Sequence, residues 1–174
     1  MTVLVAYATA HGSTRGIAER ITARLGERHV AAQARPVSEI ESVFDDDGVV
    51  VGSAIHGQAW LPEAVRFMRN NATTLAARPV WLFSVGMPGA LARPLRRWAM
   101  REGPKALAEL PDIVRPVDQQ LFTGVVLPDQ LPLVSRVILR LMGAHAGDFR
   151  DWPQIEAWAD TIAAHLAEMG TRSG

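Results

Sequence analysis

The sequence predicts an α/β fold in which helices cover both faces of a doubly wound parallel sheet. Two observations support this fold: largely apolar runs without polar alternation, and segments between them whose apolar residues recur at helical spacing. Such runs are typical of parallel strands that are buried on both faces. Strands that alternate with helices are joined by crossovers, and crossovers produce parallel pairing.

Five strands are predicted from these runs. They are Val3 to Tyr7, His29 to Arg35, Val49 to Gly52, Val80 to Val85 and Gln120 to Val126. In a chain of 174 residues, five strand–helix units fit the strand order 2-1-3-4-5 better than the larger six-stranded dinucleotide fold. We therefore expect a single domain over residues 1–174, with an inserted segment at about 127–151 between the last strand and the last helix.

The helices are predicted from spacing and from helix-start signals. A capping box of Ser38 and Glu41 indicates a short helix that carries Ile40, Val43 and Phe44. Pro62 and Pro153 suit the first turns of two longer helices. The remaining helical positions are Ile17, Ala18, Ile21 and Leu25 in the first helix, Val65, Met68, Ala72 and Leu75 after Pro62, and Ile155, Trp158, Ile162, Leu166 and Met169 after Pro153.

Charge and composition exclude several classes of protein. The chain has 18 Lys and Arg residues and 18 Asp and Glu residues, so it has no net positive charge that would attract nucleic acid. The chain has no cysteine, which excludes disulfides, thiolate metal sites and cysteine nucleophiles. The acidic run Asp45 to Asp47 does not predict a metal site, because adjacent side chains point in different directions. No stretch reaches the ~18 apolar residues of a spanning helix, and no secretory signal is recognised, so a cytoplasmic protein is expected.

The loop Thr9-Ala10-His11-Gly12-Ser13-Thr14 leads from the first strand directly into the first helix. Free backbone N–H groups converge at a helix N-terminus, and the helix dipole favours negative charge there. The chain contains neither a GxGxxG fingerprint for a pyrophosphate nor the GxxxxGK[ST] lysine for a triphosphate. These hydroxyls and amides therefore favour a monophosphate. The alternative is an ordinary helix cap made of turn-forming residues.

The first loop resembles the TxTGxT-type phosphate loop of flavodoxins, with His11 where the usual pattern has threonine. A closer resemblance is to the menaquinone-dependent protoporphyrinogen dehydrogenases, a flavodoxin-like family. The motifs that carry it are Val50-Val51-Gly52-Ser53-Ala54-Ile55 leading to Gly57, Phe67 to Leu75 around Asn71-Ala72-Thr73, Phe83-Ser84-Val85, Gly124 with Pro128, Arg136 to Met142, and Asp151-Trp152. The segment between Met142 and Asp151 is shorter than in that family.

This resemblance implies a flavodoxin-like fold with FMN as cofactor, its phosphate in the first loop and its isoalloxazine ring between two later loops. The implied cofactor-binding residues are Thr9, Ala10, His11, Gly12, Ser13, Thr14, Ser53, Ala54, Ile55, His56, Gly57, Gln58, Trp60, Ser84, Val85, Gly86, Met87 and Gly89. Gly57 would let a peptide near the flavin flip, since glycine tolerates positive φ. Trp60 would either stack on the ring or pack in the core. His56, the only titratable side chain of the ring loops, is a candidate proton donor.

Two further segments separate the hypotheses on function. An apolar helical stripe within 131–142 either packs in the core or contacts a lipophilic partner such as a quinone, at the inner face of a membrane. The basic stretch Arg93 to Lys105 is either solvated or a wall for the propionates of a porphyrinogen or the acidic tail of a deazaflavin. The leading hypothesis is dehydrogenation of a porphyrinogen with electrons passed to a quinone. The alternatives are a flavodoxin-type electron carrier and a deazaflavin-binding protein.

Overall fold

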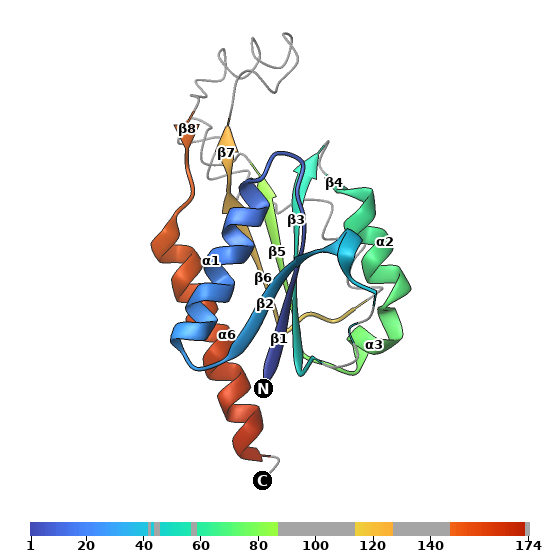
Figure 1. Ribbon diagram of the computed structural model, residues 1–174, viewed down its shortest axis with the longest axis vertical. Helices are drawn as coiled ribbons and strands as arrows, with labels where there is room; N and C mark the ends of the chain where they lie inside the picture. The colour runs from blue at the N-terminus through green and yellow to red at the C-terminus, as the bar shows by residue number, and fades with distance from the viewer. Residues whose placement is uncertain (42, 44–45, 57–58, 87–113, 127–146, 173–174) are drawn as a thin grey trace.

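The computed structural model describes residues 1–41, 43, 46–56, 59–86, 114–126 and 147–172 (Figure 1). Its centre is a parallel sheet with helices on both faces, as the sequence predicts. The parallel strands are β1 (Thr2–Ala8), β2 (Ala31–Pro36), β3 (Gly48–His56), β5 (Val80–Gly86) and β6 (Asp118–Thr123). A two-residue strand, β4 (Ala59–Trp60), turns back antiparallel to β3.

The strand order is β2-β1-β3-β5-β6. This is the predicted order 2-1-3-4-5, because β4 is only the return arm of a hairpin and not a strand–helix unit. Helices α1 (Ser13–Glu27) and α6 (Trp152–Arg172) cover one face, and α2 (Pro62–Asn70) and α3 (Ala72–Ala76) cover the other (Figure 1).

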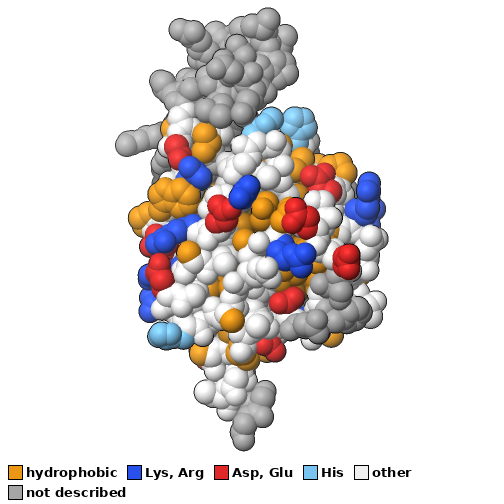
Figure 2. Space-filling view, viewed as in Figure 1, with side chains coloured by type: hydrophobic (Ala, Val, Ile, Leu, Met, Phe, Trp, Pro, Cys, Tyr) orange, Lys and Arg blue, Asp and Glu red, His pale blue; other side chains and the backbone are white. Residues whose placement is uncertain are grey.

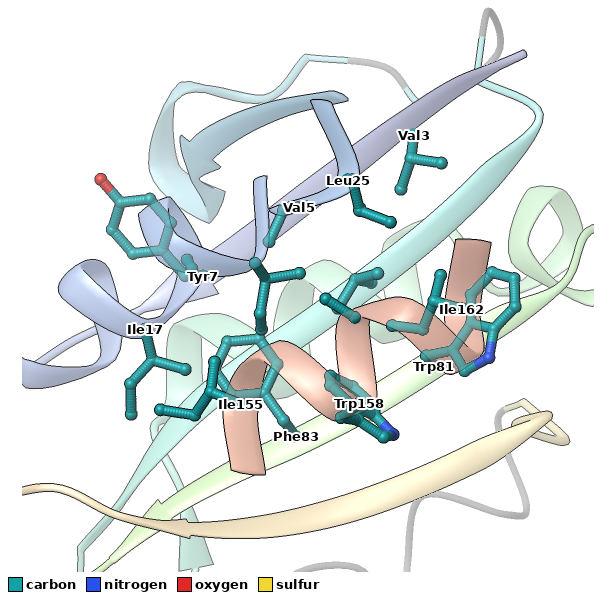
Figure 3. Packing of buried hydrophobic residues seen from close by; sticks show 14 of the residues in the cluster. Val3, Val5, Tyr7, Ile17, Leu25, Trp81, Phe83, Ile155, Trp158 and Ile162 are labelled. Atoms are coloured by element: carbon teal, nitrogen blue, oxygen red, sulfur yellow. The ribbon is translucent and has the colours of Figure 1, made fainter. Parts of the chain in front are cut away.

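Two hydrophobic clusters hold the layers together. In β1, Val3, Val5 and Tyr7 belong to the cluster under α1 and α6, while the alternate residues Leu4 and Ala6 belong to the cluster under α2. Both faces of the central strands are thus buried, which explains why their sequences lack polar alternation. Figure 3 shows side chains from β1, α1, β5 and α6 meeting in the layer between the sheet and the two helices.

An ion-pair cluster joins α1 to α6 at the surface, where Figure 2 shows acidic and basic side chains next to one another. Arg24 and Arg28 each donate two hydrogen bonds to the carboxylate of Asp160, and Arg20 pairs with Glu156 at 2.7 Å. The hydrogen bonds from Arg24, and then those from Arg28, hold the pKa of Asp160 well below its ordinary value.

Asp160→Asn is therefore expected to lower stability at neutral pH. Because the folded pKa of Asp160 lies below the unfolded value, its contribution is fully present above the unfolded pKa of about 4 and is lost as pH falls through the folded pKa. Urea unfolding should show that wild type and variant differ less in free energy of unfolding at pH 3 than at pH 7. Glu41→Gln, an exposed carboxylate outside the cluster, is the control. A difference in free energy of unfolding that is the same at both pH values would contradict the stabilising role of the Asp160 carboxylate.

The structure corrects the prediction of a short helix that carries Ile40 and Val43. Among the described residues of this segment, Val37–Glu39 form a 3-10 turn, η1, and Ile40 is extended with φ −99° and ψ 111°. Phe44, which the prediction also placed on the helix, lies outside the described residues. The strand registers place Pro36 level with Tyr7 and Gly48 level with Val3, so the chain between them returns by four rungs of β1. Val37 and Val43 belong to the hydrophobic cluster under α2, and Ile40 packs against it, so burial of these side chains favours the observed path over the helix that the capping residues predict.

Three predicted boundaries also differ. The helix predicted from Pro62 to Leu75 is divided at Asn71, whose side-chain amide donates to the Phe67 carbonyl at 2.9 Å and so competes with the helical pattern. The third strand continues through Ser53 to His56 instead of ending at Gly52. The last predicted strand is divided at Gly124, after which β7 (Val125–Val126) leaves the sheet and pairs with β8 (Gly147–Asp148).

Of the predicted insertion at 127–151, residues 127–146 lie outside the described residues, as do the apolar stripe at 131–142 and the basic stretch 93–105. Within the described part of the chain, no helix is both long enough and apolar enough to cross a membrane.

Candidate functional site

The strand registers bring the predicted ligand loops to one edge of the sheet. Ala8 pairs with Ser53, which in turn pairs with Ser84, so β1, β3 and β5 are level at this rung. Gly86 pairs with Thr123 two rungs further on. The first loop, the β3–β4 hairpin, the end of β5 and the turn at Gly124 therefore leave the sheet side by side, at the carboxyl edge where ligands of such sheets bind.

The first loop ends in a helix N-terminus that the described residues leave uncapped. Gly12 is the residue before α1 and has φ 87°, in the left-handed region that favours glycine. Its N–H donates to Thr9 Oγ1 at 2.9 Å, but no side chain caps α1, and the first turn of α1 contains no acidic residue. The positive end of the helix dipole is thus uncompensated by the described residues.

Thr14, the second residue of α1, has a hydroxyl without a partner. Its side chain is fully buried, and Oγ1 forms no hydrogen bond with any described residue. Leaving a buried hydroxyl unpaired costs about 1–3 kcal/mol, so native structures rarely tolerate it without a reason. A hydroxyl in this state at an uncapped helix start is suited to donating to an anion that the described residues do not provide.

The turn after β6 packs tightly against this N-terminus. A Cβ atom on Gly124 would lie 2.8 Å from Val85 Cγ1 and 3.0 Å from Ser13 Oγ, so only glycine fits without displacing a neighbour. The Gly124 N–H donates to the Gly86 carbonyl at 2.9 Å, and the Phe149 N–H donates to the Gly124 carbonyl at 3.3 Å. Gly124 thus fixes the β5 end beside the first loop. In the sequence Gly124 lies within the predicted strand Gln120 to Val126, and with Pro128 it is one of the motifs that carry the family resemblance.

The serines predicted as ring contacts use their hydroxyls inside the protein. Ser53 and Ser84 are fully buried. Ser53 Oγ accepts the Leu61 N–H at 3.0 Å and donates to the Ala54 carbonyl at 2.9 Å. Ser84 Oγ accepts the indole N–H of Trp60 at 2.8 Å. These side chains hold the loops in place and are not presented to a ligand.

The expectation that Trp60 stacks on a ring is not what the structure shows. The side chain is only 3% exposed and belongs to the hydrophobic cluster under α2, with its polar atom bonded to Ser84. Trp60 is therefore a core residue, which was the alternative interpretation. The physical reason is that β4 pairs Trp60 with Ile55, which points the indole along the sheet face toward β5.

The other predicted site residues divide by exposure. Exposed at the carboxyl edge are Ala10, His11, Gly12 and His56; partly buried are Thr9, Ser13, Ala54, Ile55 and Gly86; Val85 is buried in the core. Gly57, Gln58, Met87 and Gly89 lie outside the described residues. No group of three or more His, Asp or Glu side chains in the described part of the chain is placed to hold a metal ion.

Beside the first loop, Arg150 links the residues of segment 147–152 to one another. Arg150 donates to both carboxylate oxygens of Asp148 and lowers the pKa of that carboxyl. Its guanidinium carbon lies 4.5 Å from the centre of the Trp152 ring. The same guanidinium approaches α1 so closely at Gly16 that a Cβ there would lie 2.6 Å from Nη1.

Comparison with solved structures finds the same fold in several flavodoxins. A flavodoxin from the domain Archaea is 18% identical with TM-score 0.53, over 82% of this chain and 94% of its own. The flavodoxin of Streptococcus pneumonia TIGR4 is 12% identical with TM-score 0.62, over 95% and 99%. At these identities the likeness concerns the fold alone.

Larger proteins also contain this fold. Rubredoxin oxygen:oxidoreductase from Desulfovibrio gigas is 17% identical with TM-score 0.59, over 96% of this chain but only 36% of its own.

No curated protein sequence matches the chain. The sequence does match a family model, described as a flavodoxin domain, over residues 4–152, from within β1 to the first residue of α6. The chain therefore belongs to the flavodoxin domain family.

Proposed function

We propose that the chain binds FMN and acts as a flavin-dependent redox protein. The observation that carries this proposal is the buried hydroxyl of Thr14, which lacks a partner among the described residues at the uncapped start of α1. Membership of the flavodoxin domain family supports it. The hydroxyls of Thr9, Ser13 and Thr14, together with the N–H groups of the first helical turn, would hold the phosphate.

Bound FMN would supply the hydride and electron chemistry, and the protein would bind, orient and tune it. The β3–β4 hairpin and the segment after Gly86 would border the ring. Because Trp60 is buried, ring contacts would come from the hairpin backbone and from its exposed residues, among which is His56. His56 remains the candidate for holding a proton at that edge.

The finer proposal is dehydrogenation of a porphyrinogen with a quinone as acceptor. It rests on the sequence resemblance to the menaquinone-dependent protoporphyrinogen dehydrogenases. Each turnover would remove two electrons and two protons from the porphyrinogen and would deliver them to one quinone, which becomes a hydroquinone. We place such activity in the cytoplasm, at the inner face of a membrane that supplies the quinone.

A comparison of FMN with riboflavin tests the cofactor proposal, because riboflavin has the ring but lacks the phosphate. We expect purified protein to show flavin absorbance, mass spectrometry of the released molecule to identify FMN, and calorimetry of the apoprotein to give at least about 100-fold tighter binding of FMN. Two charge-assisted hydrogen bonds of about 1.5 kcal/mol each suffice for that ratio. Equal affinities contradict the phosphate assignment, and tighter binding of a deazaflavin coenzyme contradicts FMN.

The substrate proposal has its own assay. FMN-loaded protein is incubated with protoporphyrinogen IX and a menaquinone analogue, and porphyrin fluorescence is compared with the autoxidation control. Fluorescence above the control, with loss of the quinone, supports the proposal. No increase, together with a stable one-electron-reduced flavin during titration with a reductant, assigns the chain to the electron carriers instead.

A further inference from the structure

A buried hydrogen bond ties together the two segments that would border the flavin ring. The indole N–H of Trp60, on the return arm of the β3–β4 hairpin, donates to Oγ of Ser84 on β5 at 2.8 Å. Both side chains are almost completely enclosed, with 3% of Trp60 and none of Ser84 exposed. The bond therefore joins the connection after β3 to strand β5 near its carboxyl end, at Ser84.

A second hydroxyl fixes the same hairpin to its own strand. Ser53 lies directly opposite Ser84 in the β3–β5 register. Its Oγ accepts the Leu61 N–H at 3.0 Å, at the residue where the hairpin passes into α2. The two neighbouring serines thus hold Trp60 and Leu61, the two consecutive residues at which the chain leaves the hairpin.

These bonds add direction to the packing of Trp60 in the cluster under α2, which by itself does not fix where the hairpin lies along the sheet. Its ladder consists of two pairs, Ile55 with Trp60 and His56 with Ala59, and such a short ladder is marginally stable by itself. If the hairpin moved away from β5, the indole N–H and the Ser84 hydroxyl would be left unpaired in the core. Native structures strongly disfavour unpaired buried groups, so the spacing of hairpin and β5 is narrowly defined.

We propose that the Trp60–Ser84 hydrogen bond is a positioning device that sets the separation of β4 (Ala59–Trp60) from the end of β5 (Ser84–Gly86) and so preorganises a site for the flavin ring. This inference rests on the proposed function. Trp60 acts here as a positioning residue through its buried N–H group, and not by stacking on the ligand. The phosphate and the ring are accordingly recognised by separate parts of the protein: the phosphate by the start of α1, and the ring beside β4 and the end of β5, which the hydrogen bond holds together.

Three variants test the device: Trp60→Phe, which removes the donor, Ser84→Ala, which removes the acceptor, and the double variant. We expect each single variant to bind riboflavin and FMN about tenfold more weakly, so that the FMN-to-riboflavin ratio stays at the wild-type value. Tenfold corresponds to about 1.4 kcal/mol, in the range of one neutral hydrogen bond. The circular dichroism of the bound flavin should change as well, because the ring is held less precisely.

Trp158→Phe is the matched control. Trp158 is a second buried indole, and its N–H donates to Asp118 Oδ2 at 2.7 Å. This bond lies on the α6 side of the sheet and at the start of β6, the end opposite the candidate site. The control should lose stability in urea unfolding without losing riboflavin affinity. Equal losses of riboflavin affinity in Trp158→Phe and Trp60→Phe overturn the inference, since global destabilisation would then explain both.

The double variant separates positioning from stability. Replacing both partners leaves no unpaired polar atom, so the free energy of unfolding should recover part of what either single variant loses. Riboflavin affinity should remain low, because the link between the segments is still absent. Wild-type riboflavin affinity in either single variant overturns the inference while leaving the proposed function intact. A wild-type protein that binds no flavin at all overturns both.

Discussion

Thr14→Val is expected to weaken FMN binding by about 10- to 100-fold and to leave riboflavin binding unchanged. Valine has almost the shape of threonine, so the change removes the hydroxyl and little else. A hydrogen bond to a charged group contributes about 1.5–3 kcal/mol, which gives this range. Calorimetric titration of the two apoproteins with both flavins measures the effect.

The same variant should be more stable than the wild type when no flavin is present. Thr14 Oγ1 is fully buried and has no partner among the described residues, so its removal relieves an unpaired polar atom. We expect the free energy of unfolding of the apoprotein to rise by about 1 kcal/mol. Gain of stability with loss of affinity is typical of a group kept for a ligand and not for folding.

Thr22→Val is the control for this pair of effects. Thr22 lies on the same helix, two turns further on, and its hydroxyl already donates to the Ala18 carbonyl at 2.9 Å. The control should leave the ratio of FMN affinity to riboflavin affinity at the wild-type value. It should change the free energy of unfolding of the apoprotein by no more than about 0.5 kcal/mol. If Thr14→Val binds FMN as tightly as wild type, the phosphate does not lie at this helix start.

Gly52→Ala is expected to lower the free energy of unfolding by about 3 kcal/mol or to prevent folding. A Cβ at this position would lie 2.0 Å from Phe83 Cζ, far inside van der Waals contact. The Phe83 ring cannot move aside easily, because it is fully buried and its centre lies 6.0 Å from that of Phe122 and 6.1 Å from that of Trp158. Overpacking of a dense core costs about 1–3 kcal/mol, and rigid neighbours place this site at the upper end.

Gly26→Ala makes the same chemical change where space is available. Gly26 lies within α1, and nothing comes within 4 Å of the added Cβ. Alanine is the better helix former, so this control should gain about 0.5–1 kcal/mol. Urea unfolding of wild type and both variants gives the comparison. Two alanine variants of equal stability would show that Phe83 is free to repack.

The sequence predicted the sheet well because its signals there are strong and local. Every residue from Val3 to Ala8 and from Val49 to Val51 is buried, as expected for strands that are covered on both faces. The first loop was also recognisable, since hydroxyls and a glycine between a strand and a helix have a direct physical meaning. What periodicity did not contain was the packing of Val37, Ile40 and Val43 into one cluster under α2, where Ile40 is extended although the capping residues favour a helix.

Taken by itself, the sequence determined the α/β class and the loop that follows β1, because each depends on the spacing of neighbouring residues. The strand order followed from the number of strand–helix units that the chain length holds. Only the tertiary structure decided the roles of Trp60, Ser84, Thr14 and Gly124. Whether an indole faces a ligand or a serine depends on the β3–β5 register, and the two partners are 24 positions apart in the chain. Whether a hydroxyl lacks a partner depends on every group packed around it, which no local pattern records.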